Sequence, residues 1–239
     1  MDQIMIERYA ETLLACSTMS DVQHAFGIAI ANDGFFTSAA RAFTPRSKHQ
    51  VETFFLNWPE EWKKLSIERQ FVKKSPVVSE ARRRHAPFTW EQLKGERLFS
   101  AEENEVWALV VEWGWTDGFV VPIHGPCGYA ATIAMASKEK QLKLPPATRM
   151  RLYMLAILTH ERCRSLSKFL SASPLDEALT ARELECLKWV ADGQTDERIG
   201  VILGISSETV RFHVDNVRGK LGVRNRAQAV AQLYLSGLL

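Results

Sequence analysis

Cysteine is scarce in this sequence, and its arrangement excludes several classes of protein. The 239 residues include four cysteines, none in a CxxC pair and none with histidine partners at the spacing of a metal site. A zinc ribbon and a disulfide-stapled scaffold are therefore excluded, and we expect reduced thiols. The four residues are Cys16, Cys127, Cys163 and Cys186.

Long hydrophobic runs are also missing. No apolar stretch approaches the roughly 18 residues that a membrane-spanning helix needs. The N-terminus carries Asp2, Glu7 and Arg8 among its apolar residues, unlike a secretion signal. We therefore expect a cytoplasmic protein that has no membrane partner.

Motifs of catalysis are absent too. The sequence has no nucleophile elbow, no glycine-rich phosphate loop, no metal-binding cluster and no suitably flanked pair of carboxylates. The formal net charge is only +2, which argues against a protein that coats nucleic acid by charge alone. We expect a protein that is not an enzyme and needs no cofactor.

What the sequence does contain is a run of four short helical patterns in residues 179–230, separated by turn signals. Thr180 and Glu183 have the spacing of a capping box at the start of the first pattern. Thr195 and Ser206 are placed to cap the second and third helices, which together predict a helix-turn-helix. The turns fall at Gly193, Gly204 and Gly222.

The third of these helices has one apolar face and one polar, basic face. Val210, Val214, Val217 and Leu221 recur at spacings of four, three and four, which predicts a buried stripe. A helix of this kind can enter the major groove of DNA and contact base edges. We expect base contacts from Thr209, Arg211 and Asp215, and phosphate contacts from Arg218, Lys220, Arg224 and Arg226.

This segment resembles the DNA-binding domain of LuxR-type quorum-sensing regulators and NarL/FixJ-type response regulators. The residues that carry the resemblance are Leu179, Thr180, Arg182, Glu183, Leu187, Gly193, Thr195, Ile199, Leu203, Ser206, Thr209, Val210, His213, Val214, Lys220, Leu221, Asn225 and Arg226. The resemblance implies that the helix at 206–221 is the recognition helix and that the next helix supports the domain. A four-helix domain used only for protein contacts is the alternative, but it would not need basic residues on its exposed face.

A break in the helical pattern marks a domain boundary. Residues 148–170 form one long helical pattern, which ends where Pro174 and the preceding serines disfavour helix. We expect a sensor domain at 1–170, a linker at 171–177 and a DNA-binding domain at 178–239.

The first 170 residues mix helical and strand periods, so the predicted class is α/β. Helical patterns cover 4–16, 21–31, 76–85, 101–113 and 148–170, and strand patterns cover 35–43, 87–90, 118–123 and 129–136. This order predicts an α/β/α sandwich with a ligand cavity between sheet and helices, followed by a small all-α four-helix domain.

The sensor segment also resembles the LuxR-type ligand-binding domain. The pieces that carry the resemblance are NWPEEWKKL at 57–65, SPVV at 75–78, PFTW at 87–90 and DGFVVPIHG at 117–125, with matches at Trp62, Pro76, Trp90 and Gly118. The resemblance implies that Trp90 donates its indole N–H to the carbonyl of a lactone and that Trp62 walls the pocket. Trp58 stands one helical turn before Trp62 and is a further pocket candidate.

Three polar positions depart from the family pattern. Ser66 stands where a tyrosine is usual, Ser75 replaces an aspartate that accepts the ligand amide N–H, and near Ala134 the nearest hydroxyls are Thr132 and Ser137. A hydrogen bond to a charged group is worth about 1.5–3 kcal/mol, so ordinary lactone binding should be weakened. The candidate ligand-binding residues are Trp58, Trp62, Ser66, Ser75, Trp90 and Thr132.

We therefore expect a LuxR-type transcription regulator that is an orphan receptor, either independent of ligand or tuned to a molecule other than a lactone. Its partners would be a second copy of the chain, a roughly palindromic operator in double-stranded DNA and, if it activates, RNA polymerase. An ordinary acyl-homoserine-lactone receptor and an anti-activator that forms heterodimers are the alternatives. A phosphorylated receiver domain is excluded, because the N-terminus opens with a helix and lacks a cluster of acids.

Overall fold

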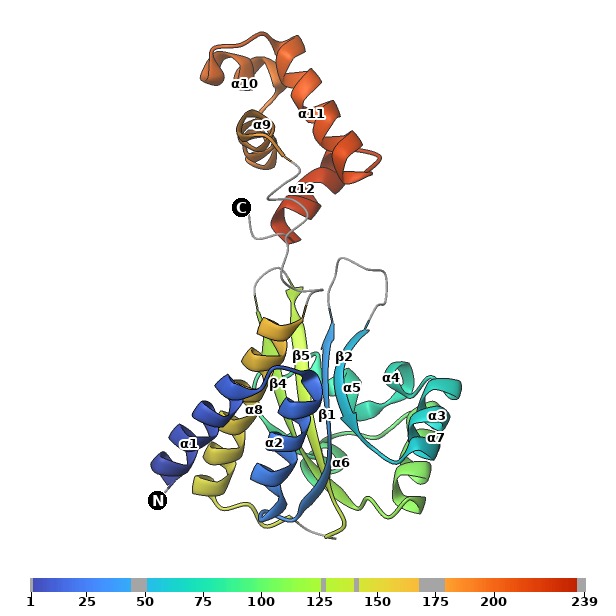
Figure 1. Ribbon diagram of the computed structural model, residues 1–239. Coiled ribbons are helices and arrows are strands. Elements are labelled where there is room, and N and C mark those ends of the chain that lie inside the picture. The colour runs from blue at the N-terminus through green and yellow to red at the C-terminus, as the bar shows by residue number, and fades with distance from the viewer. Residues whose placement is uncertain (1, 44–50, 126–127, 140–141, 168–178, 236–239) are drawn as a thin grey trace. The chain divides into compact units, whose positions relative to one another are not determined.

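The computed structural model describes residues 2–43, 51–125, 128–139, 142–167 and 179–235 (Figure 1). The chain divides into two compact units near residue 168, and each unit is described by itself. The predicted linker at 171–177 and Cys127 lie outside the described residues.

The first unit is built on a five-stranded antiparallel sheet. Its strand order is β2 (Val51–Asn57), β1 (Phe35–Phe43), β5 (Ala130–Ser137), β4 (Asp117–His124) and β3 (Phe88–Thr89). Three helices cover one face: α1 (Asp2–Ala15), α2 (Met19–Ala31) and α8 (Pro146–Leu166) (Figure 1). The other face is covered by α3 (Glu60–Glu68), α4 (Phe71–Lys74), α5 (Pro76–Ala81), α6 (Trp90–Glu96) and α7 (Ala101–Glu112) (Figure 1). The predicted α/β/α sandwich is confirmed.

Helices α3, α4 and α6 were not predicted from the sequence, and two strands also differ from the prediction. Strand β2 was not predicted, because it buries the adjacent Phe54 and Phe55 rather than alternate residues. Its pairing with β1 shifts register between Ala40 and Arg41, which removes the two-residue period. The strand predicted at 87–90 is shorter than expected, because the Thr89 side chain caps helix α6 and ends the strand there.

The packing between the sheet and helices α3–α7 is unusually rich in tryptophan. Trp62, Trp90 and Trp115 are buried there beside Phe88 and Leu93. The opposite face of the sheet packs aliphatic and phenylalanine side chains from α2 and α8. The aromatic side therefore holds the rigid, bulky side chains that can frame a cavity.

The second unit consists of α9 (Ala181–Ala191), α10 (Asp196–Leu203), α11 (Ser207–Leu221) and α12 (Arg226–Leu235). The predicted caps are confirmed: Thr180 and Glu183 form a capping box, and the hydroxyls of Thr195 and Ser206 accept backbone N–H groups at the starts of α10 and α11. Gly204, with φ of +66°, ends α10 in the left-handed conformation that suits glycine. The predicted four-helix unit is confirmed.

Candidate functional site

A cavity of about 80 Å³ lies between the sheet and helices α3–α7. A volume on the order of 10–15 Å³ accommodates one water molecule, so this space admits a small guest. Its lining is mostly apolar and aromatic. The lining residues are Ala39, Arg41, Trp58, Trp62, Phe71, Val72, Ser75, Pro76, Val77, Val78, Trp90, Val106, Trp107, Val110, Trp115, Thr132 and Ala134.

Strand periodicity explains what the sheet contributes to the cavity. Ala39 and Arg41 on β1 pair with Ala134 and Thr132 on β5, so all four side chains lie on one face of the sheet. The two alanines leave room above the sheet. The other pair, Arg41 and Thr132, places polar groups at the floor of an otherwise apolar space.

The tryptophans form a connected wall. The ring centroid of Trp62 lies 4.8 Å from that of Trp115, 5.2 Å from that of Phe71 and 5.3 Å from that of Trp113. The rings of Trp90 and Trp107 meet edge to face at 5.3 Å. Such contacts hold large side chains in fixed orientations, so the shape of the cavity is set before any guest enters.

Four buried polar atoms along this lining have no hydrogen-bond partner among the described residues. They are Arg41 Nε, Trp62 Nε1, Trp90 Nε1 and Thr132 Oγ1. Buried polar groups in folded proteins are nearly always hydrogen-bonded, and three of these four can only donate. The cavity is therefore prepared for a guest that carries hydrogen-bond acceptors.

Arg41 is the residue that sequence reasoning missed. Its side chain is buried, with 7% of the residue exposed, and its guanidinium carbon lies 4.7 Å from the ring centroid of Trp58. Burial lowers the pKa of Arg41 to about 10, so the group is still charged at neutral pH. A single arginine among the small residues of β1 was the available sequence signal.

Five of the six predicted ligand-binding residues line the cavity, and one does not. Trp58, Trp62, Ser75, Trp90 and Thr132 are in the lining. Ser66 is buried in α3, where its hydroxyl donates to the carbonyl oxygen of Lys63 at 2.8 Å. Its hydroxyl is therefore engaged within its own helix and does not face the cavity.

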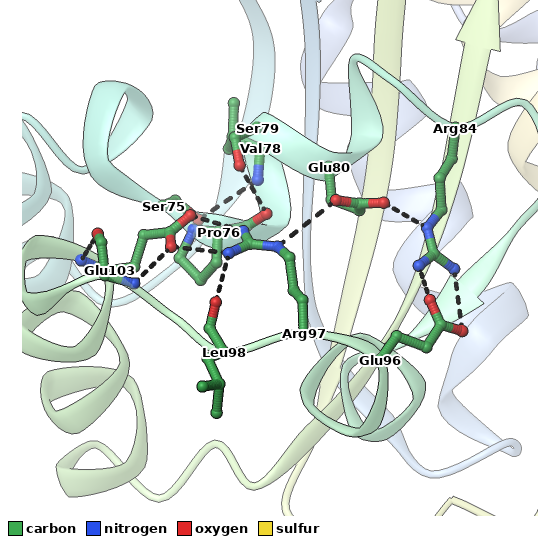
Figure 2. A network of polar contacts seen from close by, with 11 residues as sticks. Ser75, Pro76, Val78, Ser79, Glu80, Arg84, Glu96, Arg97, Leu98 and Glu103 are labelled. Carbon is green, nitrogen blue, oxygen red and sulfur yellow. Dashed lines mark hydrogen bonds and ion pairs between the residues drawn. The ribbon is translucent and has the colours of Figure 1, made fainter.

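A network of ion pairs connects the helices on this side (Figure 2). Glu80 of α5 accepts a hydrogen bond from Arg84 Nε at 2.6 Å and lies 3.7 Å from Arg97 Nε. Arg84 also pairs with Glu96 at the end of α6, and Arg97 reaches Glu103 in α7 at 2.6 Å. The hydrogen bonds from Arg97 lower the pKa of Glu103 to about 2. The network thus joins three helices that wall the cavity.

Ser75 belongs to the same region (Figure 2). It caps α5, and its hydroxyl oxygen accepts the N–H of Val78 at 3.4 Å. One of its acceptor positions is thereby used, although the residue also lines the cavity. A serine here supplies no negative charge to a guest.

In the second unit, helix α11 buries Val210, Val214 and Val217 as predicted, while Leu221, the fourth residue of the predicted stripe, is only partly buried. Its opposite side is exposed. Arg211 has 67% of its side chain exposed, and its Nε lies 3.7 Å from a carboxylate oxygen of Asp196. Thr209 is half-buried, and its hydroxyl lies 3.0 Å from that of Ser206.

Two of the residues predicted to contact phosphates form ion pairs within the second unit. Lys220 donates to the buried carboxylate of Glu183 at 2.7 Å, and Arg226 donates to Asp196 at 2.7 Å. Burial alone would raise the pKa of Glu183, but the hydrogen bonds from Lys220 and from Thr180 outweigh it, so the pKa is lowered.

The remaining polar candidates lie near the end of α11. Arg218 donates to Asp215 at 2.6 Å and to the backbone oxygen of Arg224 at 2.7 Å, while the side chain of Arg224 is exposed. Arg211 and Arg224 are therefore the basic residues of the set that are best placed to meet a ligand.

Phe212 is a second residue that the sequence analysis missed. It is 61% exposed and stands on α11 between Arg211 and the half-buried His213, away from the valine stripe. An exposed phenylalanine on a groove-binding helix can contact the methyl group of thymine. The signal was an apolar residue off the buried stripe.

Known families match both units. A model described as the autoinducer binding domain matches residues 19–163, and one described as bacterial regulatory proteins of the luxR family matches residues 177–233. Among the described residues, no helix is both long and apolar enough to cross a membrane. The same residues contain no cluster of side chains suited to a metal ion.

Curated relatives and solved structures agree with these matches. The chain is 33% identical over 212 residues to the HTH-type quorum sensing-dependent transcriptional regulator RpaR of Rhodopseudomonas palustris, covering 88% of this chain and 85% of the relative. It is 29% identical to the transcriptional activator LuxR of Aliivibrio fischeri, covering 77% of this chain and 73% of the relative. The crystal structure of SdiA from Escherichia coli superposes with a TM-score of 0.77 at 20% identity, covering 99% of this chain and 97% of the other.

Proposed function

The chain belongs to the LuxR family of bacterial regulatory proteins and carries an autoinducer-binding domain, and from this premise we propose a dimeric regulator whose cavity takes a ligand other than an acyl-homoserine lactone. The protein is a quorum-sensing transcriptional regulator with a DNA-binding helix-turn-helix and is not an enzyme. Its ligand, its oligomeric state and its operator are the subjects of the proposal.

One observation carries the proposal about the ligand: the lining of the cavity contains no carboxylate. By family resemblance, the amide N–H of a lactone ligand donates to an aspartate at the position of Ser75. A serine hydroxyl accepts a weaker hydrogen bond than a carboxylate does, and the Ser75 oxygen already accepts one from the N–H of Val78. The hydrogen bond that is lost is worth about 1.5–3 kcal/mol, or roughly ten- to a hundredfold in affinity.

The proposed DNA reading rests on the exposed side of α11. Arg211, Phe212 and Asp215 are exposed there and would contact base edges, with Thr209 beside them. Arg224 and the outward-facing parts of Arg218, Lys220 and Arg226 would contact phosphates and fix the register. Acting in the cytoplasm as a homodimer, the protein would bind a roughly palindromic operator with half-sites about 34–36 Å apart, and would contact RNA polymerase where it activates.

A thermal melt tests the proposal about the ligand. The protein is expressed in a host that makes no lactone and is melted with and without acyl-homoserine lactones of several chain lengths. A ligand at a hundredfold excess over Kd stabilises the folded state by about 2.7 kcal/mol. We expect no lactone to produce such a shift, and a clear upward shift would establish an ordinary lactone receptor instead.

The variant Ser75→Asp is the matched control for this melt. Aspartate is as good a helix cap as serine, so α5 should be kept while the missing carboxylate is restored. A lactone response gained by this variant and absent from the wild type would assign the loss to residue 75.

Operator binding is tested separately with the purified full chain and promoter fragments. A dimer that binds a two-fold symmetric site supports the proposal. Failure of the homodimer to bind any fragment, together with capture of a related regulator as a heterodimer, would support an anti-activator.

A further inference from the structure

We propose that the cavity binds a small monocarboxylate, whose negative oxygens accept hydrogen bonds from the Arg41 guanidinium and the Thr132 hydroxyl while its compact apolar body lies among the tryptophans. The inference rests on the proposed function, since it assigns a ligand class to the same sensor cavity. It goes further by naming the group that the ligand must carry.

The position of Arg41 is the first argument. It lies in β1, paired with Thr132 of β5 on one side and with Thr53 of β2 on the other. Both neighbouring strands therefore place a threonine opposite it, and the acid on β2, Glu52, pairs with Ala42 instead. The guanidinium lies over the ring of Trp58, which keeps it beside the cavity that both residues line.

The missing counter-charge is the second argument. Among the described residues no carboxylate pairs with Arg41, and its Nε atom is buried without a hydrogen-bond acceptor. A buried charge is costly unless it is paired and hydrogen-bonded. The face of an aromatic ring attracts a cation but accepts no strong hydrogen bond. The described residues thus supply no balancing anion for Arg41, and the carboxylate of a ligand would supply it.

The other unpaired atoms favour the same kind of guest. Trp62 Nε1 and Trp90 Nε1 are donors, and the Thr132 hydroxyl can donate as well. An ionised carboxylate accepts hydrogen bonds and donates none. A neutral guest or a water molecule could satisfy an N–H group, but it would leave the charge of Arg41 unbalanced.

Size and shape limit the remainder of the ligand. The cavity measures about 80 Å³, and its walls on the helix side are rings and valine side chains. A cavity of about 150 Å³ holds benzene, so a phenyl ring has little room here and a long acyl chain has less, whereas a short branched chain has suitable contacts. A short branched alkanoic acid combines a compact apolar body with the required carboxylate.

The test uses isobutyrate and isovalerate, each with its methyl ester as the neutral match, added to the full chain. Tryptophan fluorescence and thermal melting report binding. We expect the acids to quench the fluorescence and raise the melting temperature, and the esters to be at least about tenfold weaker, because a hydrogen bond between charged groups is lost.

Arg41→Met is the diagnostic variant, and Arg69→Met is its matched control, since Arg69 is an exposed arginine near α3. Arg41→Met removes a buried unpaired charge, so without ligand it should melt at the same or a higher temperature than the wild type. It should also lose the response to the acids, which the control should keep.

The outcomes separate this inference from the proposed function. The carboxylate site is supported if the acids raise the melting temperature of the wild type and of Arg69→Met, but not that of a well-folded Arg41→Met. The inference is overturned if the esters bind as well as the acids, or if no acid raises the melting temperature of the wild type. Operator binding and the absence of a lactone response are decided by their own tests and do not depend on this result. An Arg41→Met protein that binds the acids normally would also overturn it.

Discussion

The indole of Trp90 lies directly against the Cα of Gly118. A Cβ atom at position 118 would stand 2.5 Å from Trp90 Cε2, 2.8 Å from Trp90 Nε1 and 2.6 Å from the carbonyl oxygen of Met135. The glycine is needed here for space. The absent side chain on β4 thus fixes where the indole N–H of Trp90 lies along the cavity.

Gly118→Ala should therefore push Trp90 out of place. Overpacking of this kind costs about 1–3 kcal/mol, and the backbone oxygen of Met135 cannot move aside as a flexible side chain would. Urea unfolding should show the loss, and the intrinsic fluorescence of the folded protein should change. Gly95→Ala in α6 is the control, because nothing lies within 4 Å of a Cβ there. A Gly118→Ala protein as stable as the control would contradict the expected contact.

Gly200 has the same role inside the helix-turn-helix. A Cβ on it would lie 2.7 Å from the carbonyl oxygen of Ile205, in the turn that precedes α11. We expect Gly200→Ala to separate α10 from this turn, to destabilise the second unit by about 1–3 kcal/mol and to weaken operator binding. Circular dichroism melts and fluorescence anisotropy on operator DNA measure the two effects. Gly219→Ala, which meets open space in α11, should retain stability.

Arg211→Ala tests base reading by α11. The side chain is largely exposed and its contact with Asp196 is long, at 3.7 Å, so its removal should hardly alter stability. The expected loss is about 1–3 kcal/mol at one base pair of the operator. Arg182→Ala on α9, which removes another exposed arginine, serves as the control. Equal weakening on all DNA sequences would make Arg211 a phosphate contact.

Lys220→Ala should lower the stability of the second unit more than it weakens DNA binding. Lys220 donates to Glu183, whose side chain is only 4% exposed, so the variant leaves a buried carboxylate with only its capping contacts. An unsatisfied charged group of this kind costs about 1–3 kcal/mol or more. Urea unfolding of the full chain should show a lower midpoint for its second unit. If stability is unchanged and only the salt dependence of DNA binding falls, Lys220 is a phosphate contact alone.

The Arg97–Glu103 pair predicts how the sensor unit responds to acid. The pKa of Glu103 is lowered from 4.5 to about 2 by its hydrogen bonds with Arg97. A lowered pKa in the folded state contributes stability above pH 4.5 that is lost as the pH falls toward 2. Because the pair is partly exposed to solvent, we expect a contribution on the order of 1 kcal/mol.

Glu103→Gln checks this response. Its free energy of unfolding should be lower than that of the wild type at pH 6, and the difference should shrink as the pH falls from about 5 to 2. Glu102→Gln, one residue earlier and exposed, is the control. A constant difference across this range would show that the pair does not titrate as described.

Local signals explain why the second unit could be predicted closely. Its helix starts depend on Thr180, Thr195 and Ser206, each of which caps a helix through atoms three residues away. Such interactions can be read from short stretches of sequence. The sandwich class followed in the same way from the order of helical and strand patterns.

The cavity depends on contacts between distant segments, so the sequence predicted it less completely. The family resemblance predicted a ligand contact at Ser66, four residues after Trp62. In the structure Trp58 and Trp62 are themselves the two aromatic residues, four apart, that line the cavity. The burial of Arg41 depends on a register shift in β1 and on strand β2, neither of which has a local signature.

Glu80 lies at the junction of the ion-pair network, and its carboxylate is shared between Arg84 and Arg97. Arg84 joins the segment after α5 to Glu96 at the end of α6, and Arg97, just past α6, joins α6 to Glu103 in the first turn of α7. All three helices contribute residues to the lining of the cavity. Loss of the Glu80 carboxylate would remove a contact from both arginines, so three walls of the cavity depend in part on a single side chain.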